Sequence, residues 1–200
     1  MGPPRRRLSS APIRPALLVF VEGRRTEELY LVDWHRRQRE RILVAIHPFR
    51  GEPLQLVEKA VATKRAEAHE ERKLRWRPHD QIWCVFDRDE RRTFAEAIAL
   101  AERNDIFLAI SNPCLELWFL LHFQDQTAHL ERHAAQERVQ TLLHCSKVRS
   151  ESALVELAER CDAAKERAMS PYAMHARDGS PPASNPSSGV WKLIDVIRDS

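Results

Sequence analysis

The chain has 200 residues, of which 43% are hydrophobic and 30% are charged, and its formal net charge is +3. This composition is typical of a globular protein and excludes a disordered or collagen-like chain. No apolar run approaches the roughly 20 residues that span a bilayer, so we expect a cytoplasmic protein without membrane contact.

The first half of the chain alternates apolar runs with helical patterns. Residues 1–15 contain four prolines and several arginines, which predicts a flexible basic arm. Short apolar runs then suggest buried strands, and amphipathic or charged stretches between them suggest helices. The expected strands are 16–21, 42–46, 82–86 and 106–110, and the expected helices begin near 26, 54, 94 and 112. This order predicts an α/β fold, with a parallel sheet of about four strands flanked by helices over residues 16–125.

The pattern changes after residue 125. Residues 129–144 and 150–169 are amphipathic without intervening strand patterns, and each predicts a helix. Residues 170–189 are rich in Pro and Ser and predict a long loop, followed by a short helix over 190–198. We therefore expect residues 126–200 to form a helical annex packed on the core.

Acidic residues follow two of the expected strands. Glu22 comes directly after the first strand, and Asp87 and Asp89 follow the third. The carboxyl edge of a parallel sheet is where ligands bind in open α/β folds, so these three side chains could converge. Clustered carboxylates favour a hard divalent cation such as Mg²⁺ or Mn²⁺. Gly23 would let the backbone approach a phosphate closely.

The same residues have simpler explanations. Aspartates after strands often form turns or cap helices, and Thr26 and Glu27 could simply begin the first helix. Glu116 lies four residues after Asn112 in a very apolar helical pattern. A buried Glu needs a partner or a metal, so a structural ion pair and a role in the site both stay open.

At this point the chain resembles a known family. A strand-ending Glu-Gly combined with a strand-ending Asp-x-Asp is the Toprim pattern, and the chain as a whole resembles the RloB family. The segments that carry this resemblance are Val21–Glu27, Trp83–Glu90, Ser111–Trp118, Leu121–Phe123 and Asn185–Ser188. Arg25 departs from the pattern because a lysine is common at that position.

The resemblance implies a Toprim-like, metal-dependent nuclease that cleaves RNA, transfer RNA included, or DNA in bacterial anti-phage or abortive-infection defence. Its partner would be an RloA-like ATPase, as in the similar PARIS system, and a homo-oligomer is open. Glu22, Asp87 and Asp89 would be the catalytic and metal-binding residues. Substrate contacts would come from Gly23, Arg24, Arg25, Arg88, Asn112 and Glu116.

A rival interpretation keeps the fold and changes the role. The protein would then be a non-catalytic regulatory or docking subunit of an ATPase-containing complex. Convergent, accessible carboxylates would favour the nuclease, whereas an exposed apolar patch would favour docking.

Overall fold

The computed structural model describes residues 14–23, 25–73, 77–88, 93–144 and 150–200. A five-stranded sheet runs through the molecule in the order β2-β1-β3-β4-β5. Its strands are β1 (Ala16–Val21), β2 (Leu43–Ile46), β3 (Gln81–Asp87), β4 (Phe107–Asn112) and β5 (Ser187–Ser188). The first four are mutually parallel, and β5 pairs antiparallel with β4. The expected α/β fold with four parallel strands is confirmed.

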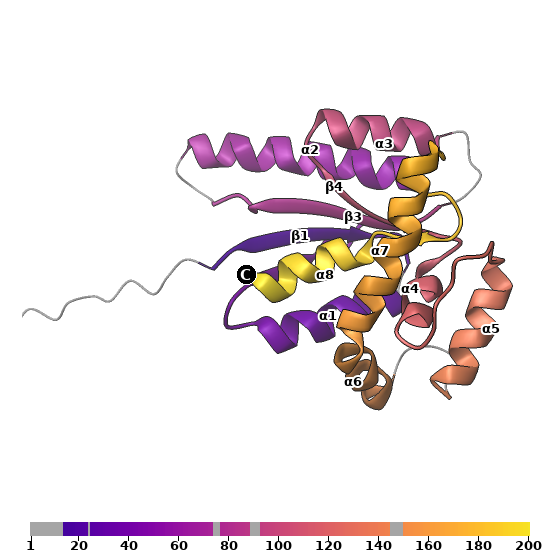
Figure 1. Ribbon diagram of the computed structural model, residues 1–200. Helices are drawn as coiled ribbons and strands as arrows, with labels where there is room; N and C mark the ends of the chain where they lie inside the picture. The colour runs from indigo at the N-terminus through magenta and orange to yellow at the C-terminus, as the bar shows by residue number, and fades with distance from the viewer. Residues whose placement is uncertain (1–13, 24, 74–76, 89–92, 145–149) are drawn as a thin grey trace, which may run out of the picture.

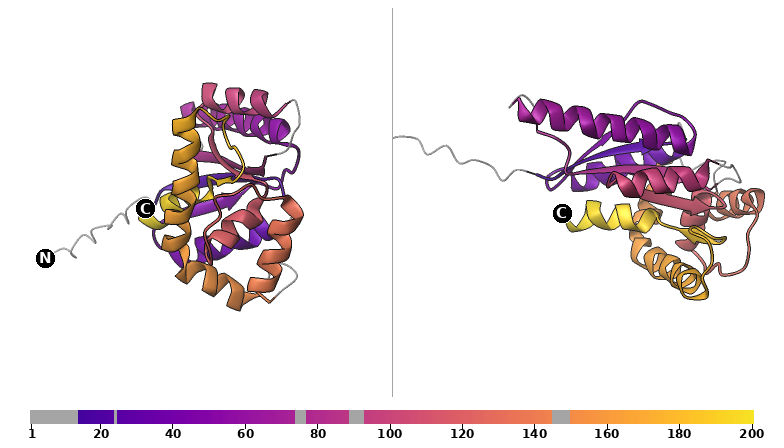
Figure 2. Two further views of the ribbon diagram at one scale, coloured as in Figure 1. Left: turned by 45° about the vertical axis from the view of Figure 1, so that its right-hand side comes forward. Right: turned by 90° about the horizontal axis from the view of Figure 1, so that it is seen from above.

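Helices cover both faces of the sheet (Figure 1). The helices are α1 (Thr26–Gln38), α2 (Pro53–Arg72), α3 (Phe94–Arg103), α4 (Leu115–Leu121), α5 (Arg132–Leu142), α6 (Glu151–Glu159), α7 (Cys161–Asp178) and α8 (Val190–Asp199). Two views show α2 and α3 on one face, with α1, α4 and α8 on the other (Figures 1 and 2). No helix in the described ranges is long and apolar enough to cross a membrane.

The strands divide their side chains between two cores because successive residues of a strand point to opposite faces. In β1, Val19 and Val21 belong to the core under α1 and α4. Leu18 and Phe20 belong to the core under α2 and α3. A strand buried on both faces needs a continuous apolar run, which explains why β1 and β3 could be recognised in the sequence.

The second half of the chain differs from the sequence prediction in three places. The expected helix over 150–169 is two helices, which meet at Arg160, and the second continues through Pro171 to Asp178. The expected loop is therefore shorter and contains the two-residue strand β5. In addition, Asn112 ends β4, and the helix that was expected to start there begins at Leu115.

Candidate functional site

The two central strands bring Glu22 and Asp87 together at their carboxyl ends. β1 and β3 are hydrogen-bonded neighbours, with Val21 opposite Val85. The backbone N–H of Glu22 donates to the carbonyl of Val85 at 3.1 Å. The backbone N–H of Asp87 in turn donates to Oε2 of Glu22 at 3.2 Å. The geometric expectation for these two residues is therefore confirmed.

The carboxylate of Asp87 is held by two donors from distant parts of the chain. Its Oδ1 accepts the backbone N–H of Leu115 at 2.9 Å, and its Oδ2 accepts Nη1 of Arg132 at 2.8 Å. The Asp87 side chain retains 19% of its exposure, and that of Arg132 retains 48%. The ion pair thus lies at the mouth of a pocket, within reach of solvent.

This pocket, which we call the acidic pocket, has a volume of about 270 Å³. Its charged and polar lining comes from three regions of the chain. These are the loop after β1 with the first turn of α1, the end of β3 with the first turn of α4, and the first half of α5. The polar side chains that line it are Glu22, Thr26, Glu27, Asp87, Glu116, Arg132 and Gln136. Four carboxylates therefore face one guanidinium among the described lining residues.

The electrostatics reflect this excess of negative charge. Burial raises the pKa of Asp87 to about 7; Arg132 opposes the shift, whereas Glu116, Glu27 and Glu22 add to it. Burial also raises the pKa of Glu27, and Glu116 contributes in the same direction. A cation in the pocket would offset these costs, because an opposite charge favours the ionised form of a carboxyl.

Gly23 allows Glu27 to occupy this position. A Cβ atom at residue 23 would lie 2.1 Å from Oε1 of Glu27, far inside any real contact distance. The carboxylate of Glu27 accepts hydrogen bonds from the backbone of Gly23 and of its own residue. Arg25, the N-cap residue of α1, makes no side-chain capping hydrogen bond, and Glu27 lies in the first turn of the helix. Glu27 therefore contributes negative charge both to the helix start and to the pocket.

The donor chemistry suits a hard divalent cation, because carboxylate oxygens are the ligands that Mg²⁺ and Mn²⁺ prefer. Within the ranges that the structure describes, however, no three His, Cys, Asp or Glu side chains form a group that could hold a metal ion. Asp89, expected as the third ligand, lies outside those ranges. The fit to magnesium therefore rests on oxygen donors and net charge.

Of the predicted substrate contacts, Gly23 and Glu116 line the acidic pocket, whereas Asn112 and Arg88 do not. Asn112 donates from Nδ2 to the carbonyl of Ala183 at 2.7 Å. Arg88 donates from Nη1 to the carbonyls of Pro182 and Ala183, both at 2.9 Å. Both side chains hold a segment of their own chain and do not line the acidic pocket. Arg25 is exposed at the start of α1, and Arg24 lies outside the described residues.

Four further residues have places in the structure that the sequence did not predict. Arg132 and Gln136 line the pocket from α5 although no sequence signal marked them. Asn185, which begins the last of the segments that resemble the RloB family, exchanges two hydrogen bonds with the backbone of Leu130 at 2.8 and 2.9 Å. His122, within the resembling segment Leu121–Phe123, is 1% exposed and packs against Trp118 in the core.

The model of the family described as RloB-like protein matches residues 17–197. The match covers every strand and almost every helix of the structure. No curated protein and no solved structure gave a significant match.

Proposed function

The chain belongs to the RloB-like family, and from this premise we propose that it is a metal-dependent nuclease with a Toprim-like site. It would cleave the phosphodiester backbone of RNA, transfer RNA included, or of DNA. The setting would be bacterial anti-phage defence by abortive infection, together with an ATPase partner. One observation supports this best: Glu22, Glu27, Asp87 and Glu116 face a single pocket at the carboxyl edge of two central parallel strands.

Glu22, Asp87 and Asp89 would hold Mg²⁺ or Mn²⁺ in this proposal. The ion would neutralise negative charge on the phosphate and activate a water molecule for attack. Glu116 would add negative charge beside these ligands. It raises the pKa of Asp87, in addition to the larger effect of burial. A metal held by acidic side chains at the edge of the sheet would be reachable by an extended phosphate backbone.

Arg132 would act on the substrate. Its guanidinium already donates to a carboxylate oxygen of Asp87, and the same planar group can donate to phosphate oxygens. Once a cation neutralises Asp87, Arg132 would be able to turn to the scissile phosphate. The chain's own residues would thereby place the phosphate between a metal and a guanidinium.

The test is co-expression of the chain with an RloA-like ATPase, followed by phage infection. Glu22→Gln keeps the shape of the side chain and removes its charge, so it should abolish protection and leave transfer RNA intact. Glu40→Gln is the matched control, because the side chain of Glu40 is 86% exposed. A folded Glu22→Gln protein that still protects cells fully would contradict the nuclease.

The alternative is a non-catalytic regulatory or docking subunit of an ATPase complex. One observation favours it: Arg132 already neutralises Asp87 directly across a 2.8 Å ion pair, as a purely structural site would require. The same co-expression experiment separates the two functions, because a regulatory subunit should tolerate the loss of charge at Glu22.

A further inference from the structure

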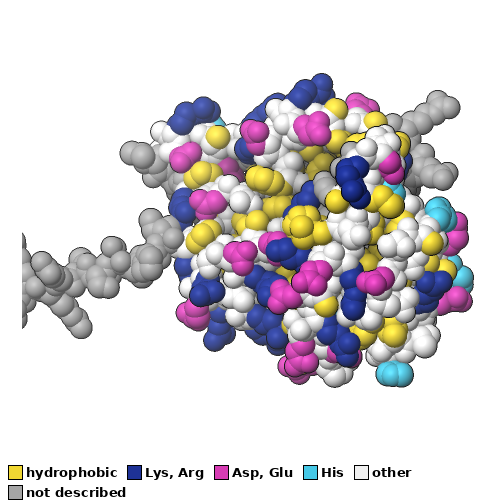
Figure 3. All heavy atoms as spheres, viewed as in Figure 1, with side chains coloured by type: hydrophobic (Ala, Val, Ile, Leu, Met, Phe, Trp, Pro, Cys, Tyr) yellow, Lys and Arg dark blue, Asp and Glu magenta, His cyan; other side chains and the backbone are white. Residues whose placement is uncertain are grey.

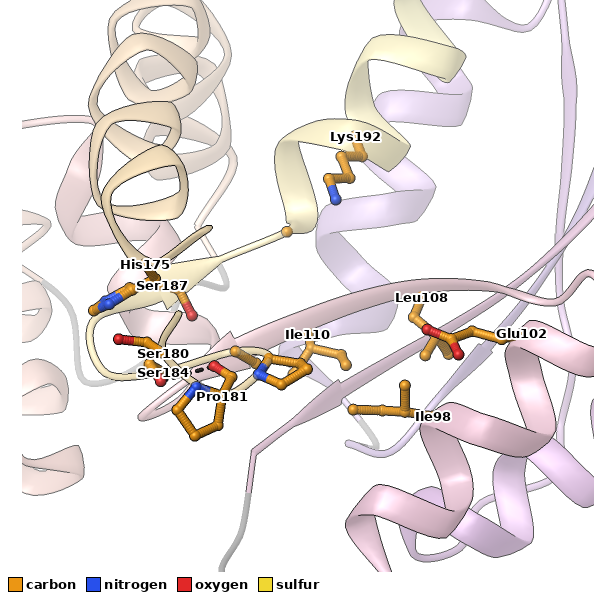
Figure 4. Close-up of a pocket in the computed structure, with 13 residues that line it drawn as sticks. Ile98, Glu102, Leu108, Ile110, His175, Ser180, Pro181, Ser184, Ser187 and Lys192 are labelled. Carbon is orange, nitrogen blue, oxygen red and sulfur yellow. Dashed lines mark hydrogen bonds between the residues drawn. The ribbon is translucent and has the colours of Figure 1, made fainter. Parts of the chain in front are cut away.

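A second pocket lies beside β4 and β5, between α3 and α8 (Figure 4), and shares no lining residue with the acidic pocket. Its volume is about 350 Å³, within the roughly 300–1,000 Å³ of typical ligand pockets. It is bounded by α3, β4, residues 180–184 and the region where β5 meets α8. In the space-filling view, hydrophobic side chains gather near the upper end of α7 and beside α3 (Figure 3). We call this second pocket the loop pocket.

One wall of the loop pocket is aliphatic. This wall consists of Ile98 of α3 and of Leu108 and Ile110 of β4. All three side chains pack against the core beneath them and are only partly buried. Pro181 lies across the pocket from them (Figure 4). An apolar wall facing a proline ring leaves a space whose two sides suit the faces of a flat ring.

Ser187 supplies the observation that points to a ligand. It lines the loop pocket and is 5% exposed, and its Oγ has no hydrogen-bond partner among the described residues. The next residue, Ser188, is also buried, but its Oγ lies 3.0 Å from Oγ of Ser111. Buried hydroxyls are normally hydrogen-bonded. A polar atom of a bound molecule would complete the bonding of Ser187.

Charged side chains border the same space from two elements. Lys192 on the first turn of α8 and Glu102 near the end of α3 both line the pocket. Figure 4 shows them above and to one side of the aliphatic wall. An ammonium group suits a phosphate. A carboxylate suits the hydroxyls of a ribose, as it does in dinucleotide-binding folds.

We propose that the loop pocket binds a mononucleotide. The base would lie between the aliphatic wall and Pro181, with a polar edge hydrogen-bonded to Ser187. The ribose hydroxyls would face Glu102, and the phosphate would face Lys192. The wall formed by residues 180–184 is fixed by Arg88 and Asn112, which bind the carbonyls of Pro182 and Ala183. This inference does not rest on the proposed nuclease.

Isothermal titration calorimetry of the full chain in EDTA tests the site with AMP, GMP, CMP, UMP and adenosine. At least one mononucleotide should bind with a Kd below about 1 mM. Ser187→Ala should weaken this binding about 5-fold, the effect of one lost hydrogen bond. Lys192→Gln should weaken the nucleotide about 5-fold or more and leave the nucleoside unchanged, because the lysine meets the phosphate. Lys59→Gln, an exposed lysine on α2, is the matched control.

Thermal unfolding separates this site from a structural role. Ser187→Ala should leave the Tm unchanged or raise it, because the hydroxyl it removes is unpaired, whereas Ser188→Ala should lower it. The proposal is overturned if none of the four mononucleotides binds with a Kd below about 1 mM. It is equally overturned if binding survives both Ser187→Ala and Lys192→Gln, or if Glu22→Gln abolishes it, since the last result would place the nucleotide in the acidic pocket.

Discussion

Replacing Asp87 with Asn should stabilise the protein at pH 8 when divalent ions are absent. Asp87 is largely buried beside three other carboxyl groups, and its pKa is raised to about 7. Ionising it at pH 8 therefore costs free energy in the folded state that is not required in the unfolded chain. Asparagine removes that cost and can still accept the backbone N–H of Leu115, which now bonds to Oδ1.

The magnitude follows from the pKa. A folded pKa of about 7 against an ordinary value of about 3.9 corresponds to roughly 4 kcal/mol. This pKa already includes the attraction of Arg132 for the ionised carboxylate, so no separate cost is subtracted for the ion pair that the variant loses. The gain should therefore be up to about 4 kcal/mol in the free energy of unfolding. For a chain of this size, that is an increase in Tm of up to roughly 8–16 °C.

The effect has a defined pH window. The folded state binds more protons than the unfolded state between about pH 4 and pH 7. The wild type therefore loses stability relative to the variant as the pH rises through this range. The advantage of Asp87→Asn should be small below about pH 4, should grow up to about pH 7 and should be constant above it.

The assay is thermal unfolding at several pH values, with and without Mg²⁺. Magnesium should stabilise the wild type by about 2.7 kcal/mol at 100 times its Kd and should have little effect on Asp87→Asn. Asp105→Asn is the matched control because Asp105 is 88% exposed. A variant that is less stable than the wild type at pH 8 without metal, or a stability difference that does not change with pH, would refute the reasoning.

Three other predictions concern neighbouring groups. Gly23→Ala should displace the carboxylate of Glu27 and lower the proposed nuclease activity at least 10-fold, with the fold retained by circular dichroism; full activity would show that Glu27 has no role in the site. Arg132→Gln should lower the free energy of unfolding at pH 8 by about 1 kcal/mol or less, and an increase measured by urea titration would contradict the ion pair with Asp87. Burial lowers the pKa of His122 to about 4. Below about pH 6.5 the folded state therefore binds fewer protons than the unfolded state, and the free energy of unfolding decreases as the pH is lowered from about 6.5 to about 4. His122→Gln should reduce this loss by up to about 3 kcal/mol, and an unchanged pH profile would place the titration elsewhere.

The sequence predicted the parts of the fold that carry strong periodicity. β1 and β3 are continuous apolar runs because both of their faces are buried, and each run ends at an acidic residue. This combination also placed Glu22 and Asp87 at one edge. β5 could not be recognised, since it consists of Ser187 and Ser188 and depends entirely on pairing with the end of β4.

The rest of the site depends on contacts between distant segments. Arg132 reaches Asp87 from 45 positions further along the chain, and no local pattern distinguishes it from the other arginines of the annex. Arg88 and Asn112 had the residue types of substrate contacts, but the carbonyls of residues 182 and 183 take their donors. The Pro- and Ser-rich composition of residues 170–189 predicted a loop, but the helix in fact continues through Pro171 to Asp178.

The central claim is that the acidic pocket binds a divalent cation through Glu22 and Asp87. Titration of the purified chain with Mn²⁺ at pH 8, with free Mn²⁺ followed by electron paramagnetic resonance, measures this directly. The wild type and Glu40→Gln should each bind one ion, and Glu22→Gln should bind it at least about 10-fold more weakly, a difference of about 1.4 kcal/mol. Equal binding by the wild type and Glu22→Gln would contradict the account.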